Sequence, residues 1–351
     1  MDGRLNVLAV NAGSTSLKLD LVSEDEAVTR IESFEAVDPS QFGAVAHRVV
    51  HGGPRFREPV VIDASVREQI FELEPLAPLH NAPALAAVEQ VEAAFPGMPQ
   101  VAVFDTGFHA TIPEAAATYA LPRRWREAWG VRRYGFHGLS VQWAAERVPV
   151  PRLVVCHLGG GSSVTAVRDG RSVDTTMGFS PLDGVPMATR SGSVDPGALV
   201  YLIAEHGLDA GELDHALNVD SGLKGLAGGS GDMRELERRT AAGDDPDAEL
   251  ALGVFVHRVA AAVGAMAAAT AGLDALVFTA GIGEGSVLVR ERVCGRLGFL
   301  GVELDPARNA AVEPDCEIGA AGSQVHVHVI RAREELVAAR AARMLLVRQL
   351  P

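Results

Sequence analysis

The chain has 351 residues, of which 48% are hydrophobic and 22% charged, a composition typical of a globular protein long enough for two domains. Its formal net charge of −14 argues against nucleic acid or an anionic membrane as a partner, because both attract clustered lysine and arginine. Three cysteines without close pairing predict neither a disulfide framework nor a zinc motif, and they indicate a reducing cytoplasm. The first apolar run, residues 5–10, is too short for a signal peptide core.

The chain begins with a predicted pair of strands, residues 5–10 and 16–22, because every second residue from Leu17 is leucine. The same alternation places Ser16 and Lys18 together on the opposite face. All but two of the 31 basic residues are arginine. A lysine retained beside a Gly/Ser turn therefore suggests a need for a compact ammonium group, although chance retention would look the same.

A second unit of strand, small-residue turn and strand follows at residues 153–158, 159–163 and 164–168. Asp169 and Gly170 predict a hairpin turn after it. The repeated pattern indicates two duplicated halves rather than one continuous sheet.

A third glycine turn, residues 281–284, lies between an apolar strand at 275–279 and a helix predicted from Ser286. Such a junction exposes backbone N–H groups to an anion. One glycine loop usually makes only a tight turn, but three that each follow a strand favour nucleotide phosphate binding. Neither a Walker loop nor a dinucleotide fingerprint is present.

Helical periodicity predicts helices at residues 83–95, 140–147, 247–271 and 334–349. Prolines at 149 and 151 predict a boundary between domains 1–148 and 149–333, with the last helix, 334–351, packing back on the first domain. The alanine-rich stretch at 259–273 falls short of the ~20 apolar residues of a membrane span, so we expect a buried helix and no membrane.

A series of motifs runs in order along nearly the whole chain. They lie at residues 11–18, 47–53, 78–81, 104–109, 133–138, 157–163, 174–190, 232–234 and 280–284. In this series the chain resembles the acetate kinase family. The resemblance implies the α/β fold class, with two ribonuclease-H-like domains of the actin and sugar-kinase type and a nucleotide cleft between them.

The resemblance also implies roles for individual residues. Those expected around the phosphoryl group in flight are Arg48, Asp105, His137 and Arg190. Those expected to hold the acid with Arg48 are Val50, Leu79, Phe136 and Pro181. Those expected to bind ATP or ADP are Ser14, Ser16, Lys18, His157, Leu158, Gly159, Gly160, Gly161, Asp232, Met233, Arg234, Gly281, Ile282, Gly283, Glu284 and Gly285. Asn11 and Glu334 would lie near Mg²⁺ or Mn²⁺, and a homodimer is implied.

The implied reaction agrees with these residue types. A carboxylate with a pKa of ~4 is already ionised at neutral pH, so the reaction needs charge neutralisation rather than a base. Two arginines, a histidine and a divalent metal supply it. We therefore expect Asp105 to orient Arg48 or a metal-bound water, although a role in proton transfer is the alternative.

Each residue also has a simpler interpretation. Taken alone, Arg48 and Arg190 would be salt-bridged surface arginines, and Glu334 would complement a helix N-terminus. His326 and His328 share a strand face, but the sequence offers no evident third ligand, so we expect no zinc site.

The chain departs from the family pattern at four positions. Gly160, Gly285 and Arg333 stand where the family usually has asparagine, and Ser193 where it usually has aspartate. The interval from Lys18 to Arg48 is also shorter than usual. Three functions stay open: an acetate kinase or a propionate or other short acyl kinase, a kinase of alcohols with Asp105 as general base, and a nucleotide-binding relative that has lost catalysis.

Overall fold

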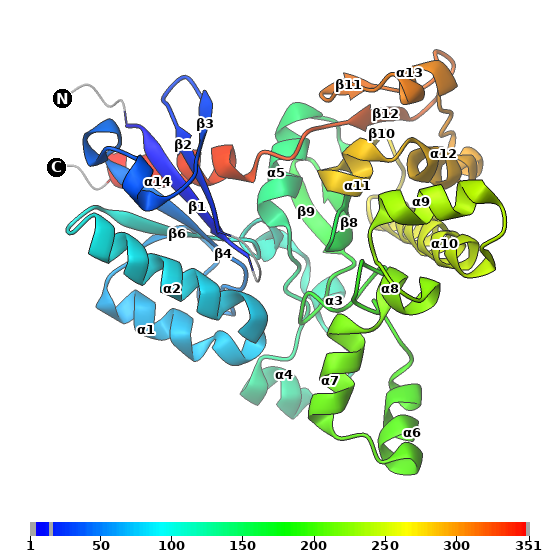
Figure 1. The fold of residues 1–351 in the computed structure, drawn as a ribbon, viewed down its shortest axis with the longest axis horizontal. Coiled ribbons are helices and arrows are strands. Elements are labelled where there is room, and N and C mark those ends of the chain that lie inside the picture. Colours follow the sequence, from blue (N-terminus) through cyan, green and yellow to red (C-terminus); the bar gives the residue numbers. More distant parts are fainter. Residues whose placement is uncertain (1–4, 14–16, 349–351) are drawn as a thin grey trace. The chain divides into compact units, whose positions relative to one another are not determined.

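The computed structural model describes residues 5–13 and 17–348, apart from the side chains of residues 75 and 78–80 (Figure 1). The chain forms two compact units. The first comprises Met1–Ala110, Phe136–Trp143 and Arg333–Pro351, and the second Thr111–Gly135 and Ala144–Ala332. The expected division at residue 148 differs from these units mainly at 111–135. That segment groups with the second unit, where Thr111 Oγ1 donates to the Ser172 carbonyl at 2.8 Å.

The first unit is built on a sheet in the order β3-β2-β1-β4-β6-β5. Its strands are β1 (Val7–Ala12), β2 (Leu17–Val22), β3 (Val28–Ile31), β4 (Ala44–Val49), β5 (Val60–Val61) and β6 (Gln100–Phe104). The first three strands form an antiparallel meander, β4 and β6 run parallel to β1, and β5 is an antiparallel edge.

Helices cover both faces of this sheet. They are α1 (Ala64–Glu72), α2 (Pro78–Ala94), α14 (Glu334–Val347) and the start of α5 (Gly138–Arg147), with short 3₁₀ turns at Phe34–Ala36, Pro39–Gln41, Glu74–Leu76 and Phe108–Thr111. Figure 1 shows α2 on one face and α14 on the other, and both contact β1 and β4. On the α2 face, the buried side chains of Leu8 and Val10 belong to one core with Val91 and Phe95.

The second unit repeats the same topology. Its sheet has the order β11-β12-β10-β7-β8-β9, and its strands are β7 (Arg152–Leu158), β8 (Ser162–Arg168), β9 (Arg171–Thr175), β10 (Ala275–Thr279), β11 (Cys316–Glu317) and β12 (His326–Val329). An antiparallel meander, two parallel strands and an antiparallel edge recur in the same positions as in the first sheet. The duplication expected from two strand-turn-strand patterns is therefore present in both complete sheets.

The longest helix of the second unit is α10 (Pro246–Ala269), which contacts α8, α9 and α12. The others are α3 (Glu114–Ala117), α4 (Arg123–Trp129), α6 (Pro196–His206), α7 (Ala210–Val219), α8 (Gly222–Ala227), α9 (Met233–Ala242), α11 (Ala280–Gly285), α12 (Val287–Gly295) and α13 (Pro306–Ala310), with a 3₁₀ turn at Gly298–Leu300. Asp245 caps α10 by accepting from the Ala248 N–H at 2.9 Å, and Pro246 occupies its first turn.

Helix α10 is long and apolar enough to cross a membrane by length and composition, and it is one such helix among the described residues. Its contacts assign it to the protein core instead. It packs on β7, β8 and β9, and Leu252, Phe255 and Val259 are completely buried. The helix matches the predicted range 247–271 closely, and it begins well before the alanine-rich stretch at 259–273.

The predicted elements differ from the observed ones at two places. Residues 281–284 were expected to form a turn, but they lie in the short helix α11, whose first N–H, from Ala280, donates to Glu284 Oε1 at 3.0 Å. Helix α2 begins before the predicted residue 83, so Pro83 lies inside the helix.

Two buried histidines couple the stability of the first unit to pH. His47 Nε2 lies 2.7 Å from Gln100 Oε1, and His109 Nε2 lies 2.8 Å from the Phe136 carbonyl. Burial lowers the pKa of each imidazole to about 4. The unfolded chain takes up protons first, near pH 6.5, so stability is lost as pH falls from about 6.5 to about 4.

We expect thermal unfolding of the full chain to show this loss, with each histidine contributing up to ~3 kcal/mol by pH 4. His109→Gln should reduce the dependence of unfolding free energy on pH by about one proton. The exposed His257 provides the matched control, His257→Gln, which should leave the dependence unchanged. Equal slopes for wild type and His109→Gln would contradict the assignment.

Candidate active site

Four polar side chains meet at the ends of β1, β4 and β6 in the first unit. Arg48 reaches Asp105 with both arms of its guanidinium, Nε to Oδ1 at 2.9 Å and Nη2 to Oδ2 at 2.5 Å. Its Nη1 donates to Asn11 Oδ1 at 3.1 Å, and its Nε lies 3.3 Å from Glu334 Oε2. Asn11 Nδ2 also donates to Glu334 Oε2 at 3.4 Å. The structure thus brings together the two predicted metal residues and two of the predicted phosphoryl residues.

The cluster contains one positive group, Arg48, and two carboxyl groups, Asp105 and Glu334. Burial opposes the charge of Arg48, but the Asp105 and Glu334 carboxylates raise the pKa of its guanidinium. Burial raises the pKa of Asp105, with Glu334 adding to the shift and Arg48 opposing it. Two carboxylates, Asp105 and Glu334, surround one guanidinium, so the cluster is negatively charged overall when both are ionised.

The chain after β6 is tied to Asp105 at its backbone as well. The Gly138 N–H donates to the Asp105 carbonyl at 2.9 Å, and the His137 N–H hydrogen-bonds to the Asp105 carboxylate. His137 has a positive φ of 60°, and a Cβ on Gly138 would lie 2.1 Å from the Asp105 carbonyl oxygen. Only glycine fits that contact, so Gly138 fixes the place of His137 next to Asp105.

The predicted acid-pocket residues of the first unit lie beside this cluster in sequence. Val50 and Phe136 are buried, and the Phe136 ring meets the His51 ring edge-on at 5.3 Å. The exit from β4 is held by Asn81, which exchanges two hydrogen bonds of 3.1 Å with the backbone of His51. Leu79 lies in the first turn of α2, and its side chain lies outside the described residues.

The predicted phosphate loop is described in part. Lys18 lies exposed on β2, opposite Asn11 in the antiparallel register with β1. Ser14 and Ser16 lie outside the described residues. The register places the lysine opposite Asn11, which in turn pairs with Arg48 on β4.

In the second unit, three predicted segments surround a cavity of about 620 Å³. Its lining residues are Gly159, Gly160, Ala188, Thr189, Gly231, Asp232, Met233, Arg234, Glu237, Gly281, Ile282, Gly285 and Ser286. The volume lies in the range of small-molecule sites. Two of the three glycine turns expected to bind phosphate, the β7–β8 turn and the segment that forms α11, therefore converge here with the N-terminus of α9, whose residues Asp232 to Arg234 the family resemblance implied.

Asp232 caps α9, where its carboxylate receives the Arg234 N–H at 2.8 Å and the Arg234 side chain at 2.6 Å. The Arg234 guanidinium, followed by its backbone N–H, lowers the pKa of Asp232 to about 2. Asp232 is therefore ionised at neutral pH, and its partner Arg234 is exposed.

Several predicted ATP residues do not line this cavity. Glu284 Oε1 instead accepts the N–H groups of Ala280 and Ala332, at 3.0 and 2.9 Å, and Gly283 packs on Phe278. His157 and Leu158 are buried at the end of β7, where His157 pairs with Ser163 across the hairpin. Gly161 closes the turn by accepting the Gly159 N–H at 3.0 Å. These residues lie behind the cavity surface and support the segments that line it.

Gly160 is open to substitution. A Cβ there meets nothing within 4 Å, and the residue is exposed at the turn. We expect Gly160→Asn to leave stability unchanged and to lower the KM for ATP by up to about tenfold, because an amide donor can reach a phosphate. Steady-state kinetics will check this, with Gly322→Asn as control, because Gly322 lies in an exposed turn outside the cavity and a Cβ there also meets nothing within 4 Å. An unchanged KM would show that the side chain is not needed.

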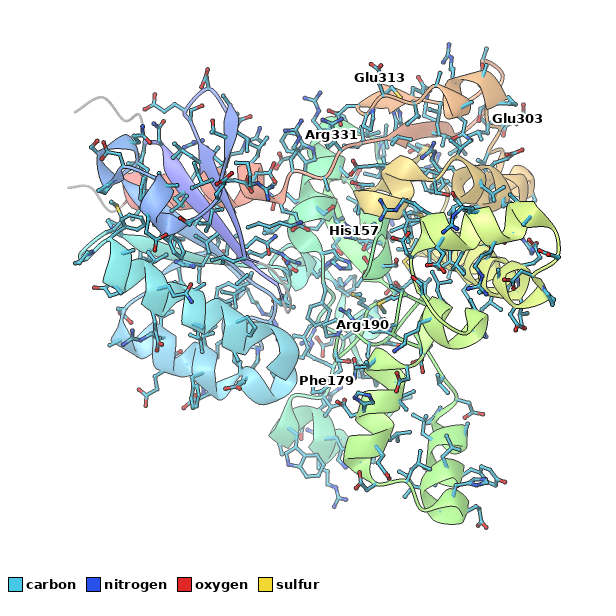
Figure 2. The ribbon with its side chains drawn as sticks, in the orientation of Figure 1. His157, Phe179, Arg190, Glu303, Glu313 and Arg331 are labelled. Carbon is cyan, nitrogen blue, oxygen red and sulfur yellow. The ribbon has the colours of Figure 1, made fainter. Side chains whose placement is uncertain are left out.

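Arg190 carries a charge without a carboxylate partner among the described residues. Its Nη1 donates to the Pro181 carbonyl at 3.1 Å and lies 3.6 Å from Met187 Sδ. Burial lowers the pKa of this guanidinium, and no carboxylate in the described parts offsets that shift. Figure 2 labels Arg190 and His157, both of which belong to the second unit. A half-buried cation without a counter-ion is the condition expected of an anion-binding site.

Comparison with known proteins identifies the family. The sequence model of the acetokinase family matches residues 25–340. An acetate kinase of Synechococcus sp. (strain JA-2-3B'a(2-13)) is 48% identical over 315 residues, which cover 88% of this chain and 77% of that protein. The chain belongs to the acetokinase family.

Solved structures of the acetokinase family have the same fold. The crystal structure of the Porphyromonas gingivalis acetate kinase matches with a TM-score of 0.86 at 33% identity, covering 97% of this chain and all of that one. A propionate kinase from Francisella tularensis subsp. tularensis SCHU S4 matches with the same score at 36% identity, over 96% and 98% of the two chains. These matches and the two duplicated sheets confirm the expected fold class.

The family implies a divalent metal, and the oxygen donors of the first unit fit one. Asn11 Oδ1 and the carboxylates of Glu334 and Asp105 are the hard ligands that such cations prefer. When bound, the metal would neutralise phosphate charge during transfer. Asn11 and Glu334 are the residues that would hold it, because Asp105 is already engaged by both arms of Arg48.

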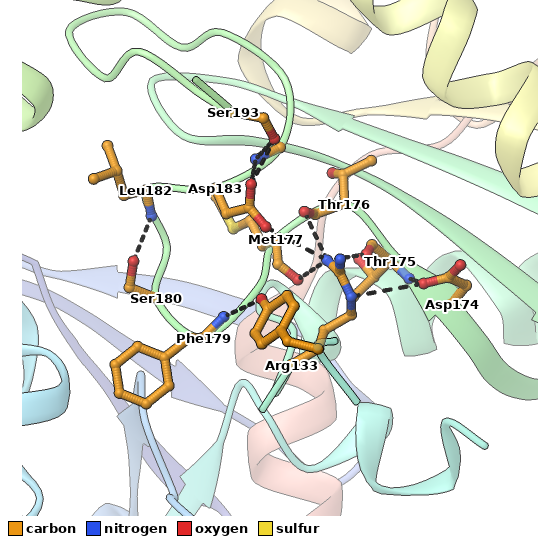
Figure 3. A network of polar contacts seen from close by, with 12 residues as sticks. Arg133, Asp174, Thr175, Thr176, Met177, Phe179, Ser180, Leu182, Asp183 and Ser193 are labelled. Atoms are coloured by element: carbon orange, nitrogen blue, oxygen red, sulfur yellow. Dashed lines mark hydrogen bonds and ion pairs between the residues drawn. The ribbon is translucent and has the colours of Figure 1, made fainter. Parts of the chain in front are cut away.

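Arg133, to which the sequence motifs assigned no role, binds the start of the loop between β9 and α6 that also carries Arg190. Arg133 Nη1 donates to the carbonyls of Thr175, Thr176 and Met177 at 2.8, 2.9 and 3.0 Å (Figure 3). Its charge lies 3.9 Å from Asp174 and 3.8 Å from Asp183. In the same network, Ser193 Oγ donates to Asp183 at 2.5 Å. Ser193, which stands where the family usually has aspartate, is therefore hydrogen-bonded within this loop.

Replacing Arg133 by methionine should disorder this loop. We expect a loss of ~1–3 kcal/mol in unfolding free energy, because three carbonyls lose their donor, together with a lower kcat from a misplaced Arg190. Thermal unfolding and kinetics of Arg133→Met check this, with the exposed Arg171→Met as control. If Arg133→Met were destabilised but kept the wild-type kcat, Arg133 would contribute to the stability of the fold and not to the placing of Arg190.

Other lining residues also escaped the sequence analysis. Glu237 and Ser286, which hydrogen-bond to each other, and Ala188 and Thr189 border the cavity of the second unit. Ala188 and Thr189 lie within the motif at residues 174–190 but were given no role, and Glu237 and Ser286 stand in no motif, so only the folded structure brings them to the cavity.

Proposed function

We propose that this chain catalyses the reversible transfer of the ATP γ-phosphoryl group to a short carboxylate, acetate first, giving an acyl phosphate and ADP. The uncompensated guanidinium of Arg190 is the observation that carries the proposal. A reaction that brings a carboxylate against a triphosphate needs a fixed cation that no protein carboxylate has already neutralised.

The proposal assigns separate tasks to the two units. In the second unit, the cavity lined by Gly160, Asp232 and Ile282 takes the nucleotide, and Arg190 neutralises charge on the phosphoryl group. In the first unit, the acid lies beside Val50 and Phe136, with the divalent metal Mg²⁺ or Mn²⁺ at Asn11 and Glu334. The transfer is direct and in line, without a phosphoenzyme.

Asp105 acts in this scheme by orienting Arg48. The acceptor carboxylate is ionised at neutral pH and has no proton to give up, so a general base has no task. Two-armed contact with Asp105 fixes the plane of the Arg48 guanidinium, and the arm shared with Asn11 faces the metal residues. Arg48 is thereby held in one orientation before substrate arrives.

Propionate is the alternative acceptor, because a propionate kinase is among the similar structures. An assay with ATP, Mg²⁺ and acetate that traps acyl phosphate as a hydroxamate tests the reaction. We expect product with acetate and a weaker or comparable yield with propionate. Nucleotide binding without acyl phosphate from any short acid would instead favour a relative that has lost catalysis.

A homodimer in the cytoplasm completes the proposal. Helix α6 buries none of its side chains, and Val200, Tyr201 and Ile203 are 65%, 56% and 47% exposed. Such an apolar helix face is typical of an association surface. The free thiols of Cys156, Cys294 and Cys316 agree with a reducing compartment. Light scattering after size exclusion measures the oligomeric state, and a monomeric mass would refute the dimer.

A further inference from the structure

Two histidines and a glutamate meet at the edge of the second sheet, on strands to which the proposed function gives no task. His326 and His328 lie on β12, and Glu317 lies on β11 opposite His328 in the antiparallel register. The nitrogen and oxygen atoms that they offer all lie within 4.8 Å of one another. The expectation that the histidine pair has no third ligand was therefore wrong, because strand pairing brings Glu317 next to them.

The spacing of these atoms is close to that of a metal ligand set. His326 Nδ1 already lies 2.7 Å from Glu317 Oε1, and the two imidazole rings are 6.2 Å apart at 31°. Ligands at ~2.1 Å from one tetrahedral zinc ion are about 3.4 Å from each other. Small rotations about the side-chain bonds would therefore bring all three onto one ion.

The cluster is open to solvent on one side. The side chains of His326 and Glu317 are 60% and 42% exposed, whereas His328 is half-buried. An ion could enter from water and keep water in its remaining position. The neighbouring carboxylate of Asp274 is neutralised by Arg152, so Glu317 supplies the negative charge of the cluster.

The local backbone gives such an ion a structural task. Strand β11 has two residues and forms the edge of the sheet, where Figure 1 shows it next to β12. Its ladder with β12 consists of the pairs Cys316 with Val329 and Glu317 with His328. An ion held by Glu317 and both histidines would cross-link this short edge strand to β12, which pairs with the central strand β10.

Ligand chemistry selects the class of ion. Two imidazoles and one carboxylate suit borderline transition metals such as Zn²⁺, whereas Mg²⁺ prefers oxygen ligands and retains its water. We propose that Glu317, His326 and His328 form a binding site for a divalent transition metal, Zn²⁺ foremost, which fastens β11 to the second sheet. The site is separate from the divalent metal of the phosphoryl transfer in both its residues and its ligand chemistry.

Calorimetric titration of the full chain with ZnCl₂ in excess Mg²⁺ tests the proposal, because Mg²⁺ occupies oxygen sites. We expect one Zn²⁺ per chain with a Kd below about 100 µM. His326→Gln should weaken this binding at least tenfold, and Glu317→Gln should weaken it to a smaller extent. Both side chains are exposed enough for the variants to fold.

The exposed His257 on α10 gives the control variant His257→Gln, which should bind Zn²⁺ as the wild type does. Zn²⁺ should also raise the Tm of wild type and His257→Gln but not that of His326→Gln. Absence of binding, or equal binding by wild type, His326→Gln and Glu317→Gln, would overturn the proposal. The latter result would place the Zn²⁺ elsewhere on the chain. None of these readouts depends on kinase activity.

Discussion

Arg190→Ala should lower kcat for acyl phosphate formation by about 10³-fold, the scale on which an arginine stabilises phosphoryl transfer. The loss should not come from unfolding. Burial of the Arg190 charge is opposed by no carboxylate among the described residues, so its removal relieves an unfavourable charge and costs little stability. Kinetics and thermal unfolding of the same preparation separate the two effects.

Two further variants sharpen this test. Arg190→Lys restores a positive charge without the planar fork, so its kcat should lie between those of wild type and Arg190→Ala. Arg168→Ala removes an exposed arginine of β8, whose nearest carboxylate, Asp169, is 4.0 Å away, and it should behave as wild type. An Arg190→Ala enzyme with wild-type kcat would remove the basis of the proposed chemistry.

Arg48→Met should destabilise the first unit by ~3–5 kcal/mol at pH 8, because it leaves the buried carboxylate of Asp105 beside Glu334 without a counter-charge. The pKa of Asp105, already raised by burial, should rise further. A carboxyl group with a raised pKa stabilises the fold below that pKa and loses the contribution as pH rises through it. The destabilisation should therefore be smaller at pH 5 than at pH 8.

Denaturant unfolding of Arg48→Met at both pH values measures this difference. Arg55→Met removes an exposed ion pair with Glu72 and should cost less than about 1 kcal/mol at either pH. A loss from Arg48→Met that is the same at pH 5 and pH 8 would mean that Asp105 does not depend on Arg48 for its charge.

The sequence predicted those features that depend on local pattern or on a shared family motif. Alternating leucines from Leu17 defined β2, and the strand-turn-strand repeat revealed two equivalent sheets. Of the three glycine turns expected to bind phosphate, those near Gly160 and Gly281 line one cavity, together with Asp232, which only the family resemblance indicated.

Features that depend on contacts between distant residues could not be predicted. The turn expected at Gly281 is a short helix, and the carbonyls of Gly283 and Glu284 near its end accept from Arg290 at 2.9 and 2.8 Å. Arg290 is held in place by Asn309, nineteen residues further along the chain. No local propensity encodes that cap. The carbonyl contacts of Arg133 were missed for the same reason, since their acceptors lie more than forty residues away.

The same limit applies to the edge of the second sheet. A search along β12 alone found His326 and His328, but Glu317 becomes their neighbour only through the β11–β12 register. Metal ligands on different strands are set by strand pairing and not by sequence spacing.

The acceptor specificity of the enzyme tests the central claim most directly. ADP formation from ATP and Mg²⁺ would be measured with acetate, propionate, butyrate and glycerol, each compared by kcat/KM. We predict activity with the short acids, highest with acetate, and none with glycerol. Stimulation by glycerol but by none of the acids would contradict the account and would return Asp105 to the role of a general base.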